Sequence, residues 1–298
     1  MHTLRHFTLA IFFSVVWSSA FIAGKIALID VDPFILLSLR FLLSAAILLP
    51  FCLSRPASLF ARRNVINGCL LGILNNAIYL GLTFQALQFI RPSLVVVIVS
   101  CAPFATMLLA TLFGQERIGA IRAAGILSGV AGVVVIAGWH PVTTCDLTGI
   151  GLAAAGTLAF AAGTVAFHDR ARGLRIRDVN FWQSVAGIAA LLPAAALLEH
   201  APTHLSRASL AAIVWLALVV TIGGMALWFW LIRTDGASVA ASWHLMNPFC
   251  GVFLSYLLLD GALKPGDFIG AGMVAIGLLL TSARRRPGMK APHDATDR

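Results

Sequence analysis

The chain has 298 residues, of which 59% are hydrophobic and only 11% are charged, and its mean hydropathy is +0.92. Soluble proteins carry about 25% charged residues, so this composition excludes an ordinary soluble enzyme, a disordered chain and a coiled coil. The net charge of +9 would suggest nucleic acid as a partner in a soluble protein. Here the basic residues lie mostly in short gaps between apolar runs, so they carry information about membrane topology instead.

Ten apolar runs follow one another along the chain. A helix that crosses about 30 Å of hydrocarbon needs about 20 residues, and backbone groups in lipid must bond internally. We therefore predict an all-α integral membrane protein with ten transmembrane helices. The predicted spans are 7–27, 33–53, 65–87, 92–113, 121–139, 148–168, 178–198, 209–232, 237–259 and 267–283.

The first run has Arg5 in front of it and small residues behind its centre, as in a signal peptide. Because the run continues to Ala27 and nine more runs follow, we interpret it as the first helix. The five cysteines have no CxxC spacing, and we expect no disulfide framework, metal site or cofactor. Gly149-x-Gly151 is not a dinucleotide fingerprint, because no strand precedes it.

Lysines and arginines are distributed unevenly over the gaps. If the N-terminus lies inside, 16 of the 21 fall in cytoplasmic segments and three in outer loops. The positive-inside rule then predicts that both termini are cytoplasmic. The same distribution accounts for the basic charge without nucleic acid.

The chain resembles itself at an offset of about 145 residues. An odd number of helices in each copy makes the second copy enter the membrane from the opposite side, which is typical of secondary transporters. We therefore predict two inverted five-helix repeats at 1–140 and 141–285, followed by a cytoplasmic tail at 286–298. The matching positions are Pro103-Phe104 and Pro248-Phe249, Gly125 and Gly270, Gly132 and Gly277, Phe84 and Phe229, and, at offset 143, Leu48-Leu49-Pro50 and Leu191-Leu192-Pro193.

Pro103 and Pro248 lie in the middle of repeat-related spans. A proline inside a helix removes a hydrogen bond and opens the backbone. We interpret the pair as hinges beside a central cavity, although proline is also a tolerated residue of membrane helices.

Polar and aromatic side chains at helical spacing are candidates for the lining of that cavity. In the first helix, Trp17, Phe21 and Lys25 share one face. The whole set of predicted substrate-binding residues is Trp17, Phe21, Tyr79, Ser100, Phe160, Thr164, His244 and Asn247, with Lys25 as a partner for a substrate carboxylate.

Each candidate also has a structural alternative. Serine and threonine in membrane helices often bond to their own helix or to a neighbour, and Trp17 is also compatible with an interface belt. Lys25 and Arg40 can extend outward to Asp30 or Asp32. His244 is either a structural histidine or the one group in the apolar midplane that titrates near neutral pH.

Several short motifs support a family resemblance. They are Trp17 in the first helix, Arg40-Phe41-Leu42-Leu43-Ser44-Ala45 in the second, Pro103 in the fourth and Phe113-Gly114-Gln115-Glu116 after it. The chain resembles the EamA-domain family of the drug/metabolite transporter superfamily, most closely exporters of the YddG type. The second half departs from the pattern at Leu259-Asp260-Gly261 and at Phe160.

The resemblance implies a secondary transporter of the bacterial cytoplasmic (inner) membrane that exports amino acids and related small metabolites by alternating access. The aromatic candidates favour aromatic amino acids, and exporters of small polar amino acids or nucleotide-sugar-like solutes are the alternatives. We expect a monomer in the lipid bilayer, with no catalytic residue. An intramembrane enzyme built on Ser100 and His244 is the rival class, but no nucleophile motif surrounds Ser100.

Cys145 provides a test of the predicted topology, because it falls in an outer loop. On a background without the other four cysteines, we expect an impermeant thiol reagent to label it from outside the cell. Labelling from the cytoplasmic side only would contradict the assignment of both termini to the cytoplasm.

Overall fold

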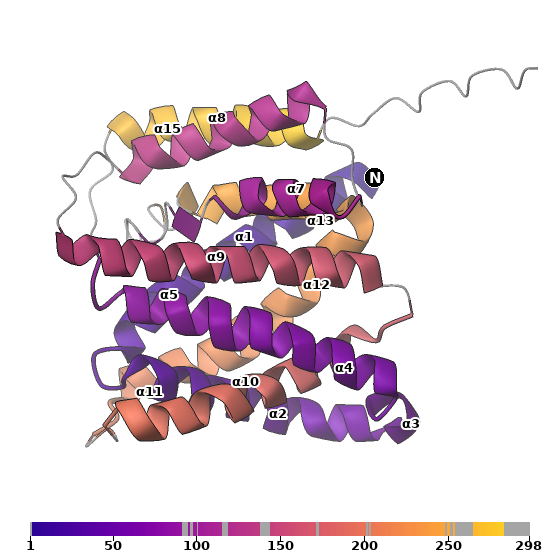
Figure 1. The fold of residues 1–298 in the computed structure, drawn as a ribbon, viewed down its shortest axis with the longest axis vertical. Coiled ribbons are helices and arrows are strands. Elements are labelled where there is room, and N and C mark those ends of the chain that lie inside the picture. Colours follow the sequence, from indigo (N-terminus) through magenta and orange to yellow (C-terminus); the bar gives the residue numbers. More distant parts are fainter. Residues whose placement is uncertain are drawn as a thin grey trace, which may run out of the picture.

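The structure is a computed structural model that describes residues 2–90, 95, 98–99, 101–114, 119–137, 144–170, 173–200, 202, 204–247, 249–250, 253 and 265–282. Within these residues every regular element is a helix (Figure 1). In chain order they are α1 (His2–Ala27), α2 (Pro33–Leu53), α3 (Pro56–Leu59), α4 (Arg62–Leu71), η1 (Gly72–Leu80), α5 (Gly81–Ala86), α7 (Ala102–Leu112), α8 (Ala120–Ala137), α9 (Thr144–Arg170), α10 (Ile176–Leu198), α11 (Arg207–Trp215), η2 (Leu216–Gly224), α12 (Met225–Asp235), α13 (Ala237–Ser242), η3 (Trp243–Met246) and α15 (Pro265–Ser282).

The prediction of an all-helical membrane protein is confirmed. In the described part of the chain six helical stretches are long and apolar enough to span a membrane: His6–Ala27, Pro33–Leu53, Arg62–Ala86, Leu147–His168, Ile176–Leu198 and Arg207–Asp235. Shorter apolar helices lie at Ala102–Leu112, Ala120–Gly132 and Phe268–Thr281. α13 and η3 occupy the first part of the remaining predicted span, and much of that span lies outside the described residues. The count of ten spans stays a prediction.

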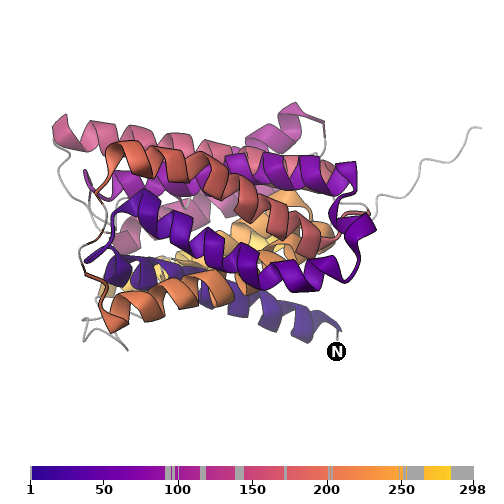
Figure 2. The same ribbon diagram turned by 90° about the horizontal axis from the view of Figure 1, so that it is seen from below.

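The helices lie side by side along a common direction, so that their ends form two opposite faces of the bundle (Figures 1 and 2). α8 and α15 form a pair at one edge of the stack, and α2, α10 and α11 lie at the other edge (Figure 1). The sides of the bundle carry large exposed apolar side chains such as Leu42, Leu210 and Ile276. An apolar outer surface over this many helices fits a lipid environment.

Two segments of the bundle are π-helices. η1 interrupts the helix that runs from Arg62 to Ala86, and η2 interrupts the helix from Arg207 to Asp235. Their bounds differ by 144 residues at each end, close to the offset of the sequence repeat. A π-helix widens the turn and leaves backbone groups out of the regular α-helical pattern, and such segments are frequent at functional sites.

Serines of α1 attach this helix to the segment around η3. Ser14 Oγ donates to Trp243 O at 3.1 Å, and one turn later Ser18 Oγ donates to Asn247 O at 3.0 Å. Both hydroxyls also lie within hydrogen-bond distance of a carbonyl four residues earlier in α1. These contacts join the first helix of the chain to one of its last.

α8 and α15 pack closely because glycines face each other. A methyl group added to Gly125 would lie 2.8 Å from Gly277 O, and one added to Gly132 would lie 2.6 Å from Gly270 O. The first residue of each pair is repeat-related to the second residue of the other pair. Small residues let membrane helices approach closely.

We expect Gly277→Ala to destabilise the α8–α15 pair. A methyl group there would lie 2.5 Å from Gly125 O and 2.8 Å from Gly129 N, and overpacking of this kind costs about 1–3 kcal/mol. The melting temperature of the purified protein in detergent should fall by several degrees. Gly272→Ala is the matched control in the same helix, because nothing lies within 4 Å of the added methyl group. Equal melting temperatures for the two variants would contradict this packing.

Candidate functional site

A cavity of about 40 Å³ lies inside the bundle. Its walls come from α1, α2, η1, α5, α9, η2 and α12, so that both π-helices contribute to it. The volume corresponds to about three water molecules and is too small for an amino acid, so the helices must move apart before a solute of that size can enter. The described lining residues are Trp17, Ala20, Arg40, Phe41, Asn75, Asn76, Tyr79, Leu80, Thr83, Phe84, Leu87, Val95, Phe160, Val220, Thr221 and Met225.

One wall of the cavity is aromatic. The ring of Phe160 lies 4.8 Å from that of Tyr79 and 6.1 Å from that of Trp17, between ring centroids. All three side chains are buried. They come from α9, η1 and α1, and the structure therefore brings together three residues that the sequence analysis selected separately.

Another wall of the cavity is polar. Arg40 Nε donates to Thr221 Oγ1 at 2.6 Å. Asn76 Nδ2 donates to the backbone carbonyl of Gln183, and Gln183 Nε2 donates to Asn76 Oδ1, each at 3.0 Å. The amide nitrogen and oxygen of Asn75 are buried, and neither has a hydrogen-bond partner among the described residues.

The π-helix η2 explains the position of Thr221. Its hydroxyl bonds to Leu216 O, five residues earlier, at 2.9 Å, and its own carbonyl accepts from Asn180 Nδ2 at 3.0 Å. Because Thr221 is fixed on both sides, it holds Arg40 in one orientation at the cavity wall.

His244 lies behind the aromatic wall and is not among the lining residues. Its ring contacts Phe13, Trp17, Phe160 and Trp228, with centroid distances between 4.7 and 5.2 Å. Nδ1 pairs with Asn247 Nδ2 at 2.8 Å, whereas Nε2 is buried without a described partner. This packing places His244 and Asn247 in a shell that supports the cavity.

The other predicted residues are spread over the molecule. Thr164 Oγ1 bonds to Phe160 O in its own helix at 2.9 Å, and Lys25 is exposed in the last turn of α1. Pro103 lies in the first turn of α7, after a turn at Cys101. The side chain of Phe21 and the whole of Ser100 and Pro248 lie outside the described residues.

Several residues of the polar wall are not among those predicted from the sequence. The predicted partner of a carboxylate is Lys25, but the structure places Arg40 at the cavity, and Lys25 is not among the described lining residues. Thr221 was not selected, and Asn75 and Asn76 were not included among the predicted binding residues. Their signal was the presence of amide and charged groups within apolar runs, where such groups are rare.

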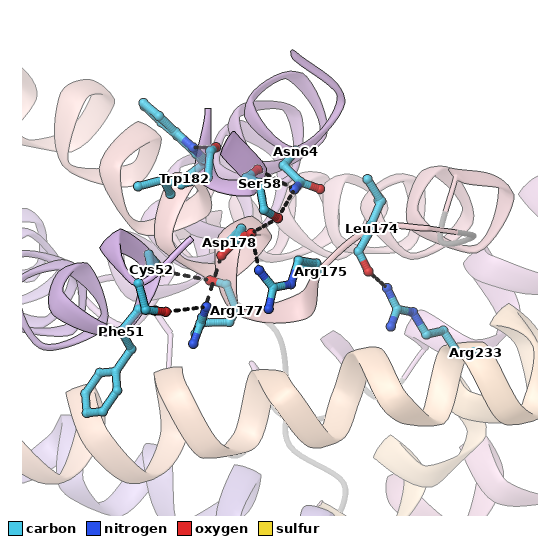
Figure 3. A network of polar contacts seen from close by, with 12 residues as sticks. Phe51, Cys52, Ser58, Asn64, Leu174, Arg175, Arg177, Asp178, Trp182 and Arg233 are labelled. Atoms are coloured by element: carbon cyan, nitrogen blue, oxygen red, sulfur yellow. Dashed lines mark hydrogen bonds and ion pairs between the residues drawn. The ribbon is translucent and has the colours of Figure 1, made fainter. Parts of the chain in front are cut away.

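Polar networks lie at the two ends of the bundle. At the end where α3 lies, buried Asp178 accepts from Ser58 Oγ at 2.5 Å and lies 3.6 Å from Arg177 Nε and 3.9 Å from Arg175 Nη1 (Figure 3). Trp182 Nε1 donates to Leu59 O nearby, at 2.9 Å. These contacts attach the start of α10 to α3 (Figure 3).

At the other end, Glu199 accepts from the backbone nitrogens of Phe34 and Ile35 at 2.8 Å each, at the first turn of α2. Burial raises the pKa of Glu199, and these two hydrogen bonds oppose that shift. Hydrogen bonds from Ser206 and Ser209 lower the pKa of Asp30 to about 2, so Asp30 is ionised at neutral pH and holds the start of α11 against the end of α1.

Comparison with known proteins identifies the family. The model of the EamA-like transporter family matches the chain twice, over residues 5–138 and 147–283. The chain belongs to the EamA-like transporter family. Together with the apolar helices, this makes it a membrane protein of a family named for transport. The resemblance stated from the sequence is confirmed.

Two relatives are similar to the chain over most of their length. The chain is 25% identical over 291 residues to an Escherichia coli (strain K12) protein named "Probable amino-acid metabolite efflux pump", covering 91% of this chain and 93% of the relative. It is 23% identical over 269 residues to "Uncharacterized inner membrane transporter YedA" of the same strain, covering 90% and 87%. A solved crystal structure shares the fold with a TM-score of 0.78 at 21% identity, covering 92% of this chain and 95% of the other.

Proposed function

We propose that this protein is a secondary transporter of the bacterial inner membrane that exports amino acids, with a preference for aromatic ones, through its central cavity. The observation that carries the proposal is the cavity itself, which lies between helices of both halves and combines an aromatic wall with a polar one. An aromatic amino acid has the same two parts, a flat apolar ring and a polar head.

Alternating access by two inverted repeats is the mechanism that we propose for it. Three features support this arrangement: the family model matches twice, the two π-helices are 144 residues apart, and the glycine contacts between α8 and α15 are reciprocal. In inverted-repeat transporters the substrate site lies at the repeat interface, and one half rocks against the other.

For topology and assembly we propose what the sequence predicts. With both termini in the cytoplasm, the end of the bundle that carries α3 and Asp178 faces the cytoplasm, and the end that carries Glu199 faces outward. The basic residues around Asp178, which include Arg175 and Arg177, agree with that orientation. We propose that the protein acts as a monomer with small solutes as its partners.

We expect Trp17→Ala to reduce the transport of labelled phenylalanine into proteoliposomes several-fold at sub-saturating substrate. The substitution removes a stacking surface, worth about 0.5–1.5 kcal/mol beyond the loss of buried area. Trp215→Ala is the matched control, because this tryptophan is 44% exposed and does not line the cavity. If both variants fold, as checked by gel filtration, and both transport like the wild type, the cavity is not the substrate site.

Pro103→Ala tests whether the start of α7 is a hinge. Alanine permits α7 to extend backwards through the turn at Cys101, and we expect the stiffer segment to lower the transport rate more than the affinity. Pro193→Ala is the control, since Pro193 lies inside α10 and is exposed. A normal maximal rate in Pro103→Ala would mean that Pro103 serves only to begin the helix.

A further inference from the structure

Arg40 is a buried cation without a carboxylate partner among the described residues. Only 4% of its surface is exposed, and it lies within the membrane-spanning helix α2. The described ion pairs of the protein involve His6, Arg175 and Arg177, and Arg40 is in none of them. A charge at this depth is costly unless it is paired, and inside membranes such residues mark ion or substrate pathways.

The hydrogen bonds of Arg40 leave most of its guanidinium unused. A guanidinium has five N–H donors in a planar fork, and Thr221 Oγ1 accepts one of them, from Nε. Neither Nη atom makes a hydrogen bond to a described residue, and the side chain lines the cavity. The two Nη atoms carry the pairs of donors that a carboxylate binds.

The described carboxylates are held elsewhere. Asp30 and Glu199 accept hydrogen bonds at one end of the bundle, and Asp178 does so at the other. Asp32 accepts from the backbone nitrogen of His200, and Asp235 pairs with His6. Within the described lining of the cavity Arg40 is the one residue that is charged at neutral pH, so the site has an excess of one positive charge.

The other half of the chain makes the equivalent contact without a charge. Gln183 follows Arg40 at the offset of 143 that relates α2 to α10, and Thr221 follows Asn76 at the offset of 145. Arg40 bonds to Thr221, and Gln183 bonds to Asn76. Since glutamine makes this contact in the second half, a structural role alone does not require arginine in the first half.

We propose that Arg40 binds the carboxylate of the transported solute, so that the cavity selects organic monoanions or zwitterions whose body packs on the aromatic wall. This inference rests on the proposed function, and it assigns to Arg40 the role that the sequence analysis gave to Lys25. Asn75, whose amide has no described partner, also lines the cavity and is available to the rest of the polar head. A single guanidinium matches the single negative charge of a carboxylate.

The test compares acids with their amides in the purified full-length protein. The probes are phenylalanine, phenylalaninamide, threonine and threoninamide, and the readout is the concentration dependence of the ligand-induced rise in melting temperature at pH 7. In the wild type we expect each acid to bind at least tenfold more tightly than its amide. Equal affinities of acid and amide would overturn the proposal without any variant.

Arg40→Gln then assigns the preference to this residue. Because the substitution copies the contact that Gln183 makes, we expect it to fold, to lower the affinity for phenylalanine at least tenfold and to leave that for phenylalaninamide within twofold. Arg233→Gln is the matched control: Arg233 bonds to Leu174 O near the bundle end and does not line the cavity, so its acid-to-amide ratio should equal that of the wild type. A folded Arg40→Gln protein with the wild-type ratio would overturn the proposal.

If Arg40→Gln does not fold, Arg40→Lys is used to test the proposal instead. Lysine keeps the charge but loses the planar fork, so the acid-to-amide ratio should fall at least threefold, and an unchanged ratio would overturn the proposal.

The two pairs of probes separate this inference from the proposed function. If both acids bind more tightly than their amides but phenylalanine binds no better than threonine, the role of Arg40 is supported and the preference for aromatic solutes is rejected. If phenylalanine binds better than threonine but acid and amide bind equally, the preference for aromatic solutes is supported and the role of Arg40 is rejected. Binding of none of the four would reject both.

Discussion

Polar groups inside a lipid bilayer have no water to bond, and this constraint orders the interior of the protein. Thr157 and Thr164 return their hydroxyl groups to carbonyls of their own helix, and Ser14 and Ser18 also join α1 to a distant helix. Among the buried polar atoms without described partners, those of Asn75 lie at the cavity and those of His244 and Asn247 lie in the aromatic shell behind it. A solute or water that enters the cavity would find its polar partners there.

Much of the fold is predictable from the sequence, because the length and apolarity of a run determine whether it can cross the membrane as a helix. Most described helices begin and end near the predicted bounds, and α2 occupies Pro33–Leu53 as predicted, whereas α7 begins only at Ala102 within the predicted span 92–113. The π-helices η1 and η2 are not predictable in this way. A π-helix keeps the apolar composition of its neighbours, and its extra residue per turn depends on contacts such as that of Thr221 with Leu216, which no periodicity reveals.

The candidate site is predictable only in its aromatic part. Trp17, Tyr79 and Phe160 occupy faces that helical spacing identifies, and the structure brings them to one wall. Spacing also placed Lys25 on the face of Trp17, but two turns of helix displace Lys25 by about 12 Å along the axis, and it emerges at the end of α1. His244 is near Trp17 as expected, yet it lies behind the ring and not in the cavity, because depth within a bundle depends on how neighbouring helices rotate.

The contrast between Arg40 and Gln183 gives the proposed repeat a functional meaning. Two copies related by a two-fold axis would present the same groups to a site on that axis, and a small asymmetric solute cannot satisfy both equally. Arg40 and Gln183 occupy equivalent positions in the two copies, but only Arg40 carries a charge. The difference costs little in packing, because each side chain bonds to a polar side chain of a π-helix, Arg40 to Thr221 of η2 and Gln183 to Asn76 of η1. The scaffold then remains symmetric enough for two similar half-motions, while the cavity has one charged end and one orientation for its solute. In this view the unpaired guanidinium is retained despite its cost in lipid because an anionic solute, for as long as it is bound, supplies the missing partner.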